Sequence, residues 1–183
     1  TTEIYTLSLH DALPISVAED TPLAITLTGT DVEGDSLSFT VVTPPGHGTL
    51  TGSGASRTYQ PATNFSGADS FTFKVNDGQL DSAEATVTIT VLSVNDPPLA
   101  NSQSLTNYED TPFAITLAGS DVEGDTLSFS IVSPPVHGTL SGTPPVLTYT
   151  PSTNFTGTDS FAFRVSDCQS NSASAALTLA ILP

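Results

Sequence analysis

The chain has 183 residues, and its 19 acidic and three basic side chains give a formal net charge of −16 at pH 7. Such a charge repels nucleic-acid phosphates and anionic lipid headgroups, so it argues against both as partners. A lone cysteine excludes an internal disulfide, and no apolar run approaches the roughly 18 residues that a membrane span requires.

Residues 1–16 differ in character from the rest of the chain. Their polar residues are scattered among Leu and Ile without the period of a strand, and the segment resembles one reading frame of a sequencing adaptor. We therefore treat 1–16 as an artefact segment and exclude it from functional reasoning; a genuine N-terminal strand is the alternative. The first repeat then lacks its own opening strand, and 9–16 occupy the place that 99–106 hold in the second repeat.

The remainder of the chain is one unit written twice, at a constant offset of about 90 residues. The duplicated segments are AEDTPLAITLTGTDVEGDSLSF and YEDTPFAITLAGSDVEGDTLSF, PPGHGTL and PPVHGTL, and NFSGADSFTFKVND and NFTGTDSFAFRVSD. Such a repeat indicates two copies of one domain, which we place at 17–96 and 97–183.

Each copy alternates apolar and polar residues with the period of a half-buried strand. In the first copy the apolar positions are Leu23, Ile25, Leu27; Leu37, Phe39, Val41; Phe71, Phe73, Val75; and Val87, Ile89, Val91. Turn-forming Gly, Pro, Asn and Asp separate these runs. About seven short strands in 80–90 residues predict an all-β fold of two tandem immunoglobulin-like antiparallel sandwiches. The sequence Asn-Asp-Pro-Pro at 95–98 then forms a stiff linker between them.

Acidic residues recur at matching places in both copies. An Asp-Val-Glu-Gly-Asp loop stands at 31–35 and again at 121–125, and a Glu precedes the second strand of each copy. Calcium takes six to eight oxygen ligands, which carboxylates in short Gly-containing loops can supply. Each acidic residue alone could equally well cap a turn.

The order of these elements resembles the cadherin-like repeats of bacterial surface proteins, over nearly all of 17–183. The resemblance implies a calcium site at the junction that both copies build, with ligands Glu19, Asn95, Asp96, Asp121, Glu123 and Asp167. It also implies a partial site toward a preceding repeat, from Asp31, Glu33 and Asp77, and one toward a following repeat, from Glu109. The pattern departs from the family in three ways: Glu123 replaces an Asp, Ser93 and Pro97 stand at further ligand places, and Asp69 is only a stand-in for the acidic pair in mid-repeat.

Other reactive side chains have simpler interpretations. His47 and His137 recur in equivalent Pro-Pro-x-His-Gly segments, which favours a role in a turn over catalysis. Cys168 replaces the Gly78 of the first copy and has no basic neighbours that would activate it. The recurring Phe and Tyr residues are expected in the core, with a sugar-binding platform as the alternative.

The sequence as a whole predicts a non-catalytic structural or adhesion module of a secreted or cell-surface protein, with Ca²⁺ making the junction rigid. Its partners would be neighbouring repeats of the same chain, with a cell-surface protein or a glycan as a further partner. Two alternatives stay open: a metal-independent passive spacer, and an accessory or glycan-binding domain of a secreted enzyme.

Overall fold

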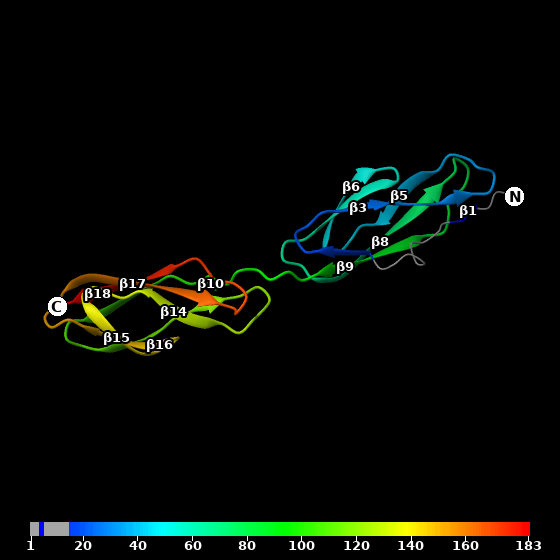
Figure 1. Cartoon of the computed structure of the whole chain (residues 1–183). Coiled ribbons are helices and arrows are strands. Elements are labelled where there is room, and N and C mark those ends of the chain that lie inside the picture. The colour runs from blue at the N-terminus through cyan, green and yellow to red at the C-terminus, as the bar shows by residue number, and fades with distance from the viewer. Residues whose placement is uncertain (1–3, 6–14) are drawn as a thin grey trace. The chain divides into compact units, whose positions relative to one another are not determined.

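The structure, a computed structural model, describes residues 4–5 and 15–183 (Figure 1). It divides into two compact units, Thr1–Val94 and Asn95–Pro183. All regular elements in the described residues are strands, which confirms the predicted all-β fold. No helix among them is long and apolar enough to cross a membrane.

The described residues of the first unit form three sheets. Its strands are β1 (Ile4–Tyr5), β2 (Ile15–Ala18), β3 (Leu23–Thr26), β4 (Thr30–Asp31), β5 (Ser38–Thr43), β6 (Gly48–Ser53), β7 (Ser56–Pro61), β8 (Gly67–Asn76) and β9 (Ala85–Leu92). A four-stranded sheet has the order β2-β9-β8-β5, a three-stranded sheet the order β3-β7-β6, and β1 pairs with β4.

The second unit has the same topology. Its strands are β10 (Leu99–Ala100), β11 (Gln103–Tyr108), β12 (Phe113–Thr116), β13 (Gly119–Ser120), β14 (Ser128–Ser133), β15 (Gly138–Thr143), β16 (Val146–Pro151), β17 (Gly157–Ser166) and β18 (Ala175–Leu182). The sheets have the orders β11-β18-β17-β14, β12-β16-β15 and β10-β13. Each unit is therefore a sandwich, and both share one strand arrangement.

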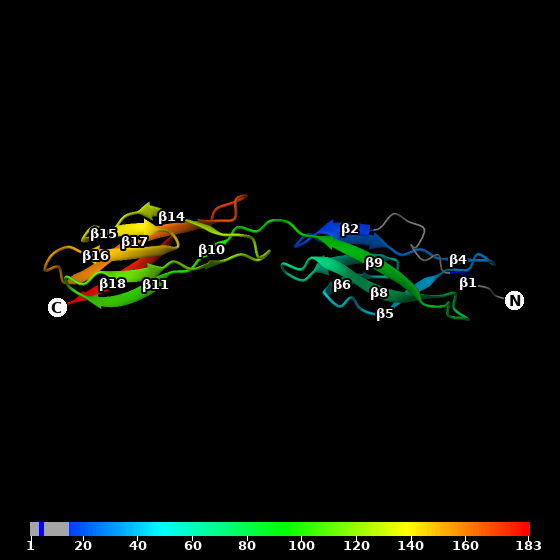
Figure 2. The ribbon, with the colours of Figure 1, turned by 90° about the horizontal axis from the view of Figure 1, so that it is seen from below.

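In each unit one strand pair is parallel, β2 with β9 and β11 with β18, and the other pairs formed by the described residues are antiparallel. Figure 2 shows β2 beside β9 and β11 beside β18. Because β2 begins at Ile15, the last two residues of the excluded segment 1–16 take part in this pairing, opposite Ile89 and Thr90. The rest of the expected replacement strand, 9–14, lies outside the described residues.

The cores follow from the period-two pattern. Along β9 and β18, alternate side chains are buried, because successive residues of a strand face opposite sides of a sheet. In the first unit the inward side chains with almost no exposure include Tyr59, Phe71, Phe73, Val87 and Ile89. Their counterparts in the second unit are Tyr149, Phe161, Phe163, Leu177 and Leu179. The predicted inward positions are confirmed, although Leu23, Leu37, Phe39 and Val41 are only partly buried against the first core.

A buried carboxylate holds the Pro-Pro-x-His-Gly loop of each unit in place. Asp69 accepts hydrogen bonds from the backbone nitrogens of Gly46 (2.9 Å) and His47 (3.0 Å) and from the Tyr59 hydroxyl (2.8 Å). Asp159 accepts the equivalent bonds in the second unit, from Val136, His137 and Tyr149. The mid-repeat acidic residue therefore ties the loop to the core, because several N–H and O–H donors occupy its oxygens. Asp69 is not a stand-in for a metal ligand.

Candidate functional site

The Asp-Val-Glu-Gly-Asp loop of the second unit follows β13 and closes on its own first residue. Oδ1 of Asp121 accepts a hydrogen bond from the backbone nitrogen of Asp125 at 3.0 Å. Gly124, with φ of 79°, makes this turn at no steric cost. Oδ2 of Asp121 is buried and has no hydrogen-bond partner. The loop therefore offers one free carboxylate oxygen to an external ligand.

The linker residue Asn95 lies against the loop that follows β17. Its side-chain nitrogen donates to Oδ2 of Asp167 at 3.0 Å. Asp167 is only 5% exposed, and its Oδ1 accepts the backbone N–H groups of Gln169 and Ser170. The bond from Ser170 above all, with those from Asn95 and Gln169, holds the pKa of this carboxyl well below its usual range, against the opposing effect of burial. Asp167 thus keeps its negative charge at any physiological pH.

The next linker residue joins the same group. The backbone nitrogen of Asp96 donates to Oε2 of Glu123 at 3.2 Å, and Oδ2 of Asp96 is buried without a partner. Oδ1 of Asn95 is likewise buried and without a partner. These contacts explain why the structure divides at Val94, two residues before the boundary expected from sequence. Five predicted ligands, namely Asn95, Asp96, Asp121, Glu123 and Asp167, therefore belong to one unit.

The oxygen atoms of these residues are of the kind that binds a hard cation, but the side chains do not form a preformed metal site. Buried oxygen atoms without hydrogen-bond partners are costly, and a cation is one way to satisfy them. Amide and carboxylate oxygens are the groups that calcium prefers. No group of three or more His, Cys, Asp or Glu side chains in the described part of the chain is arranged to hold a metal ion. The oxygens would have to converge when the ion binds.

The first unit repeats half of this arrangement. Oδ1 of Asp31 accepts from the backbone nitrogen of Asp35 (2.8 Å), and Oδ1 of Asp77 accepts from those of Gln79 and Leu80 (2.7 Å each). Oδ2 of Asp31 and of Asp77 are both buried without a partner. Hydrogen bonds from Leu80 and Gln79 lower the pKa of Asp77. The third residue predicted for this partial site, Glu33, has an exposed side chain.

Two other predicted ligands, Glu19 and Glu109, directly follow β2 and β11. Glu19 is 6% exposed, and its Oε1 accepts a hydrogen bond from the backbone nitrogen of Val94 at 2.6 Å. Glu109 is half-buried, and its backbone nitrogen donates to the carbonyl oxygen of Leu182 at 2.7 Å. Glu19 belongs to the first unit, so its sharing of an ion with the second unit stays a prediction.

The two loop histidines stack on aromatic rings. The ring centroids of His47 and Phe65 are 4.3 Å apart, as are those of His137 and Phe155, and the ring planes are almost parallel.

Tyr59 and Tyr149 are completely buried, and burial, followed by the hydrogen bonds to Asp69 and Asp159, raises their pKa. The same spacing of ten residues separates Tyr from Asp in both copies, and it was the one sequence signal for this buried pair.

Fold and site together define an acidic tandem of β-sandwich domains with carboxylate-rich loops at matching places. The family model of the bacterial Ig domain matches residues 9–90 and 95–180. The chain therefore belongs to the bacterial Ig domain family, in two tandem copies, as the repeat pattern predicts.

Known proteins with similar sequence or structure extend this picture. Integrin beta-like protein A of Dictyostelium discoideum is 36% identical over 120 residues, which are 54% of this chain and 6% of that protein. The extracellular cadherin domains 1–5 of protocadherin gamma B2 superpose with a TM-score of 0.60 at 15% identity, over 100% of this chain and 40% of that one. Human CDH23 EC21-23 gives 0.58 at 16% identity, over 93% and 67%. At such identities the likeness shows the fold alone, and it confirms the cadherin-like architecture.

Proposed function

We propose that the two repeats form a non-catalytic structural or adhesion module of an extracellular protein, and that Ca²⁺ bound at the start of the second unit orders its linker. The observation that carries the proposal is the group of three buried oxygens without hydrogen-bond partners, on Asn95, Asp96 and Asp121. A cation placed among them would satisfy these atoms and offset the charge of Glu123 and Asp167.

The physical role of the ion would be to fix the linker. The side chain of Asn95 now donates to Asp167 and, at 3.4 Å, to the Ser170 hydroxyl, and the backbone nitrogen of Asp96 donates to Glu123. Coordination would replace these weak tethers with several charge-assisted ones and would remove conformational freedom from the linker. Proline at 97 and 98 already restricts this segment, so little additional entropy has to be lost on binding. The junction would then be stiff only when calcium is present.

The location and partners of the module belong to the same proposal. The net charge of −16 is compatible with a calcium-rich extracellular setting, where cations offset the repulsion between carboxylates. The partners would be neighbouring repeats of the same chain, with a cell-surface protein or glycan as the adhesion target. The inclusion of Glu19 in the ligand set would be revealed by the variant Glu19→Gln, which should weaken the response to calcium.

Thermal unfolding with calcium and with chelator tests the proposal. An ion that binds only the folded state stabilises it by about 1.4 kcal/mol at a concentration ten times the Kd. We expect millimolar CaCl₂ to raise the melting temperature of the wild type, and the double variant Asp121→Asn, Glu123→Gln to lose this response. Superimposable curves for the wild type in calcium and in chelator would refute the role of calcium.

A passive spacer is the competing function, because no preformed cluster of metal-binding side chains occurs among the described residues. The same double variant separates the two functions. In a passive spacer, removal of two negative charges from an acidic surface should leave stability unchanged or raise it, in calcium and in chelator alike. In a calcium-dependent junction, the variant should be less stable than the wild type only when calcium is present.

A further inference from the structure

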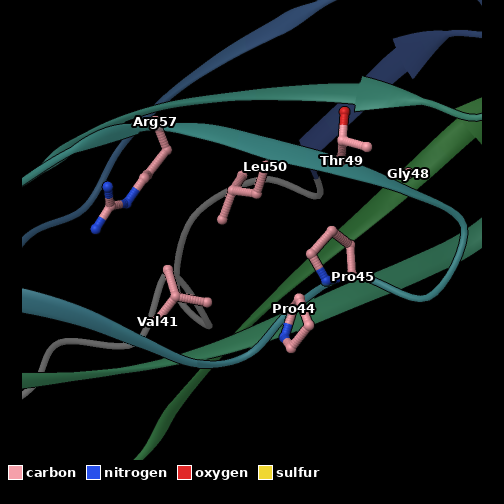
Figure 3. Close-up of a pocket in the computed structure, with 7 residues that line it drawn as sticks. All are labelled: Val41, Pro44, Pro45, Gly48, Thr49, Leu50 and Arg57. Atoms are coloured by element: carbon pink, nitrogen blue, oxygen red, sulfur yellow. The ribbon is translucent and has the colours of Figure 1, made fainter.

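A pocket of about 590 Å³ opens in the first unit between the free edges of its four-stranded and three-stranded sheets. One rim is β5, the edge strand of the four-stranded sheet, and the other is β6, the edge strand of the three-stranded sheet. Apolar side chains of Val41, Pro44, Pro45 and Leu50 line it, and Figure 3 shows the guanidinium of Arg57 at the end away from the two prolines. The described lining of the pocket therefore combines an apolar wall with the cation of Arg57.

Arg57 is placed there by the strand period. On β7 it alternates with exposed residues and shares the inward face with Tyr59 and Pro61. Its Nη1 donates to the carbonyl oxygen of Gly52 (2.5 Å) and its Nη2 to that of Phe39 (3.3 Å). These two bonds fix the orientation of the guanidinium plane without neutralising its charge.

Within residues 4–5 and 15–183, neither the charge nor one donor of Arg57 has a partner. Its Nε is buried and makes no hydrogen bond. In the part of the chain that the structure describes, the single ion pair joins Lys74 to Glu84, so no carboxylate pairs with Arg57. An uncompensated, half-buried guanidinium is costly, and its planar set of donors matches a carboxylate.

The second copy of the repeat shows that the fold does not require this arginine. Leu147 stands at the corresponding position of β16, where it is 3% exposed and belongs to the core of the second unit. The two strands otherwise pair alike, because Arg57 lies opposite Ile25 and Leu147 opposite Ile115. Arg57 is thus specific to the first unit, because the same fold accepts leucine at this position in the second unit.

Two features select the kind of occupant. The rim strand β5 has a bulge between Val41 and Thr43 and is followed directly by Pro44 and Pro45, and both devices oppose the addition of a peptide strand to an edge. A chain of net charge −16 repels polyanions, whereas a single negative charge can be held by one guanidinium at short range. The pocket therefore fits a small molecule better than a peptide or an acidic polymer.

We propose that this pocket binds a small organic monocarboxylate with an apolar body. The carboxylate pairs with Arg57, and the hydrocarbon or aromatic body packs on Val41, Leu50 and the two prolines. The volume lies within the range of about 300–1,000 Å³ that is typical of small-molecule sites. This site lies in the first unit and is independent of the calcium proposal for the second unit.

Titration of the ¹⁵N-labelled chain with 4-phenylbutyrate, followed by NMR, tests the proposal. We expect saturable amide shifts confined to β5, β6, β7 and the loop at 44–47. The neutral amide of the same compound should bind at least about tenfold more weakly, because a charge-assisted pair is lost. Equal binding of the acid and the amide, or no saturable shift at about 10 mM, would overturn the proposal.

Two variants complete the test. Arg57→Leu installs the residue of the second unit and should keep a native melting temperature while it weakens binding at least about tenfold. Arg57→Lys keeps the charge but loses the planar donor pair, so its affinity should fall between those of the wild type and of Arg57→Leu. Unchanged affinity in both variants would overturn the proposal; should Arg57→Leu fail to fold, Arg57→Lys and the comparison of acid with amide still decide it.

Discussion

The side-chain amide of Asn95 donates a hydrogen bond to Oδ2 of Asp167 across 3.0 Å, and its own carbonyl oxygen is left buried without a partner. The linker is thereby attached to the end of β17 by an amide whose free oxygen lies beside an ionised carboxylate. Buried acceptors are normally paired, so the carbonyl oxygen of Asn95 lacks the hydrogen-bond partner that such a group usually has. It gives the first prediction a specific target.

We expect Asp167→Asn to abolish the increase in melting temperature that calcium gives. The substitution removes the charge that Asn95 contacts and retains the side-chain size and one acceptor oxygen. The matched control is Asp125→Asn, which removes the same charge from the exposed end of the neighbouring loop. Differential scanning calorimetry in calcium and in chelator provides the measurement. If the two variants respond equally to calcium, Asp167 is not a ligand.

A second prediction concerns acid. The pKa of Asp159 is lowered, because hydrogen bonds from Tyr149, Val136, Ser160 and His137 together outweigh the effect of burial, which alone would raise it. A carboxyl with a depressed pKa in the folded state contributes stability above its unfolded pKa, near 3.8, and loses it as the pH falls toward the folded value. We expect Asp159 to make its full contribution to stability at about pH 5 and above, with an uncertainty of about one pH unit in that limit.

Tyr149→Phe makes that contribution measurable. Loss of a hydrogen bond to a charged group should cost about 1.5–3 kcal/mol at pH 7. The free energies of unfolding of the variant and the wild type, from urea titrations, should then converge below about pH 4 as Asp159 becomes protonated. Comparison of the two proteins cancels the relief of charge repulsion that both gain near the pI of about 4.1. A difference that stays constant down to pH 2.5 would exclude the linkage.

The third prediction separates two glycines of one loop. A Cβ at Gly48 would lie 2.5 Å from Cε2 of Tyr59 and 2.6 Å from the carbonyl oxygen of Gln60, whereas a Cβ at Gly46 meets nothing closer than Oδ1 of Asp69 at 3.8 Å. Tyr59 is fully buried and cannot move aside. Gly48→Ala should cost about 1–3 kcal/mol of unfolding free energy, by overpacking.

Gly46→Ala should change stability by less than about 0.5 kcal/mol, which makes it the control for Gly48→Ala. The second copy carries Val136 at the place of Gly46, 80% exposed, so the position accepts a larger side chain there. Equilibrium urea unfolding of both variants gives the comparison. Equal destabilisation by the two alanines would show that the close approach of Gly48 to Tyr59 is not what fixes this glycine.

Much of the fold follows from the sequence because the period of apolar residues matches the pattern of burial. Phe71, Phe73 and Val75 alternate with more polar residues along β8, and all three are buried in the core. The loop acids were also predictable, since short loops follow the strands. The role of Asp69 was not, because its donors come from a loop and a strand distant in sequence, and spacing alone does not show which side chains meet. Arg57 was missed since a charged residue on a strand is normally expected to face water.

The last prediction concerns Cys168, a residue with a Cβ at a position where the first copy has a glycine of positive φ. Cys168 adopts a positive φ of 79°, and Gly78 has 97° at the matching position. Left-handed backbone is strained by a Cβ, and the cost is about 1–2 kcal/mol for an ordinary residue. Nothing lies within 4 Å of a Cβ built on Gly78, so the strain comes from the backbone and not from contacts.

Cys168→Gly should therefore raise the free energy of unfolding by about 0.5–1 kcal/mol, after the greater flexibility of glycine in the unfolded chain is subtracted. Cys168→Ala keeps the Cβ and should leave stability unchanged, which distinguishes backbone strain from loss of the thiol. The reciprocal change Gly78→Cys should lower stability by a similar amount. Urea unfolding in reducing buffer is the appropriate measurement, because the exposed thiol could otherwise link two chains. Were Cys168→Ala to stabilise the protein as much as Cys168→Gly, the thiol itself would be the source of the cost.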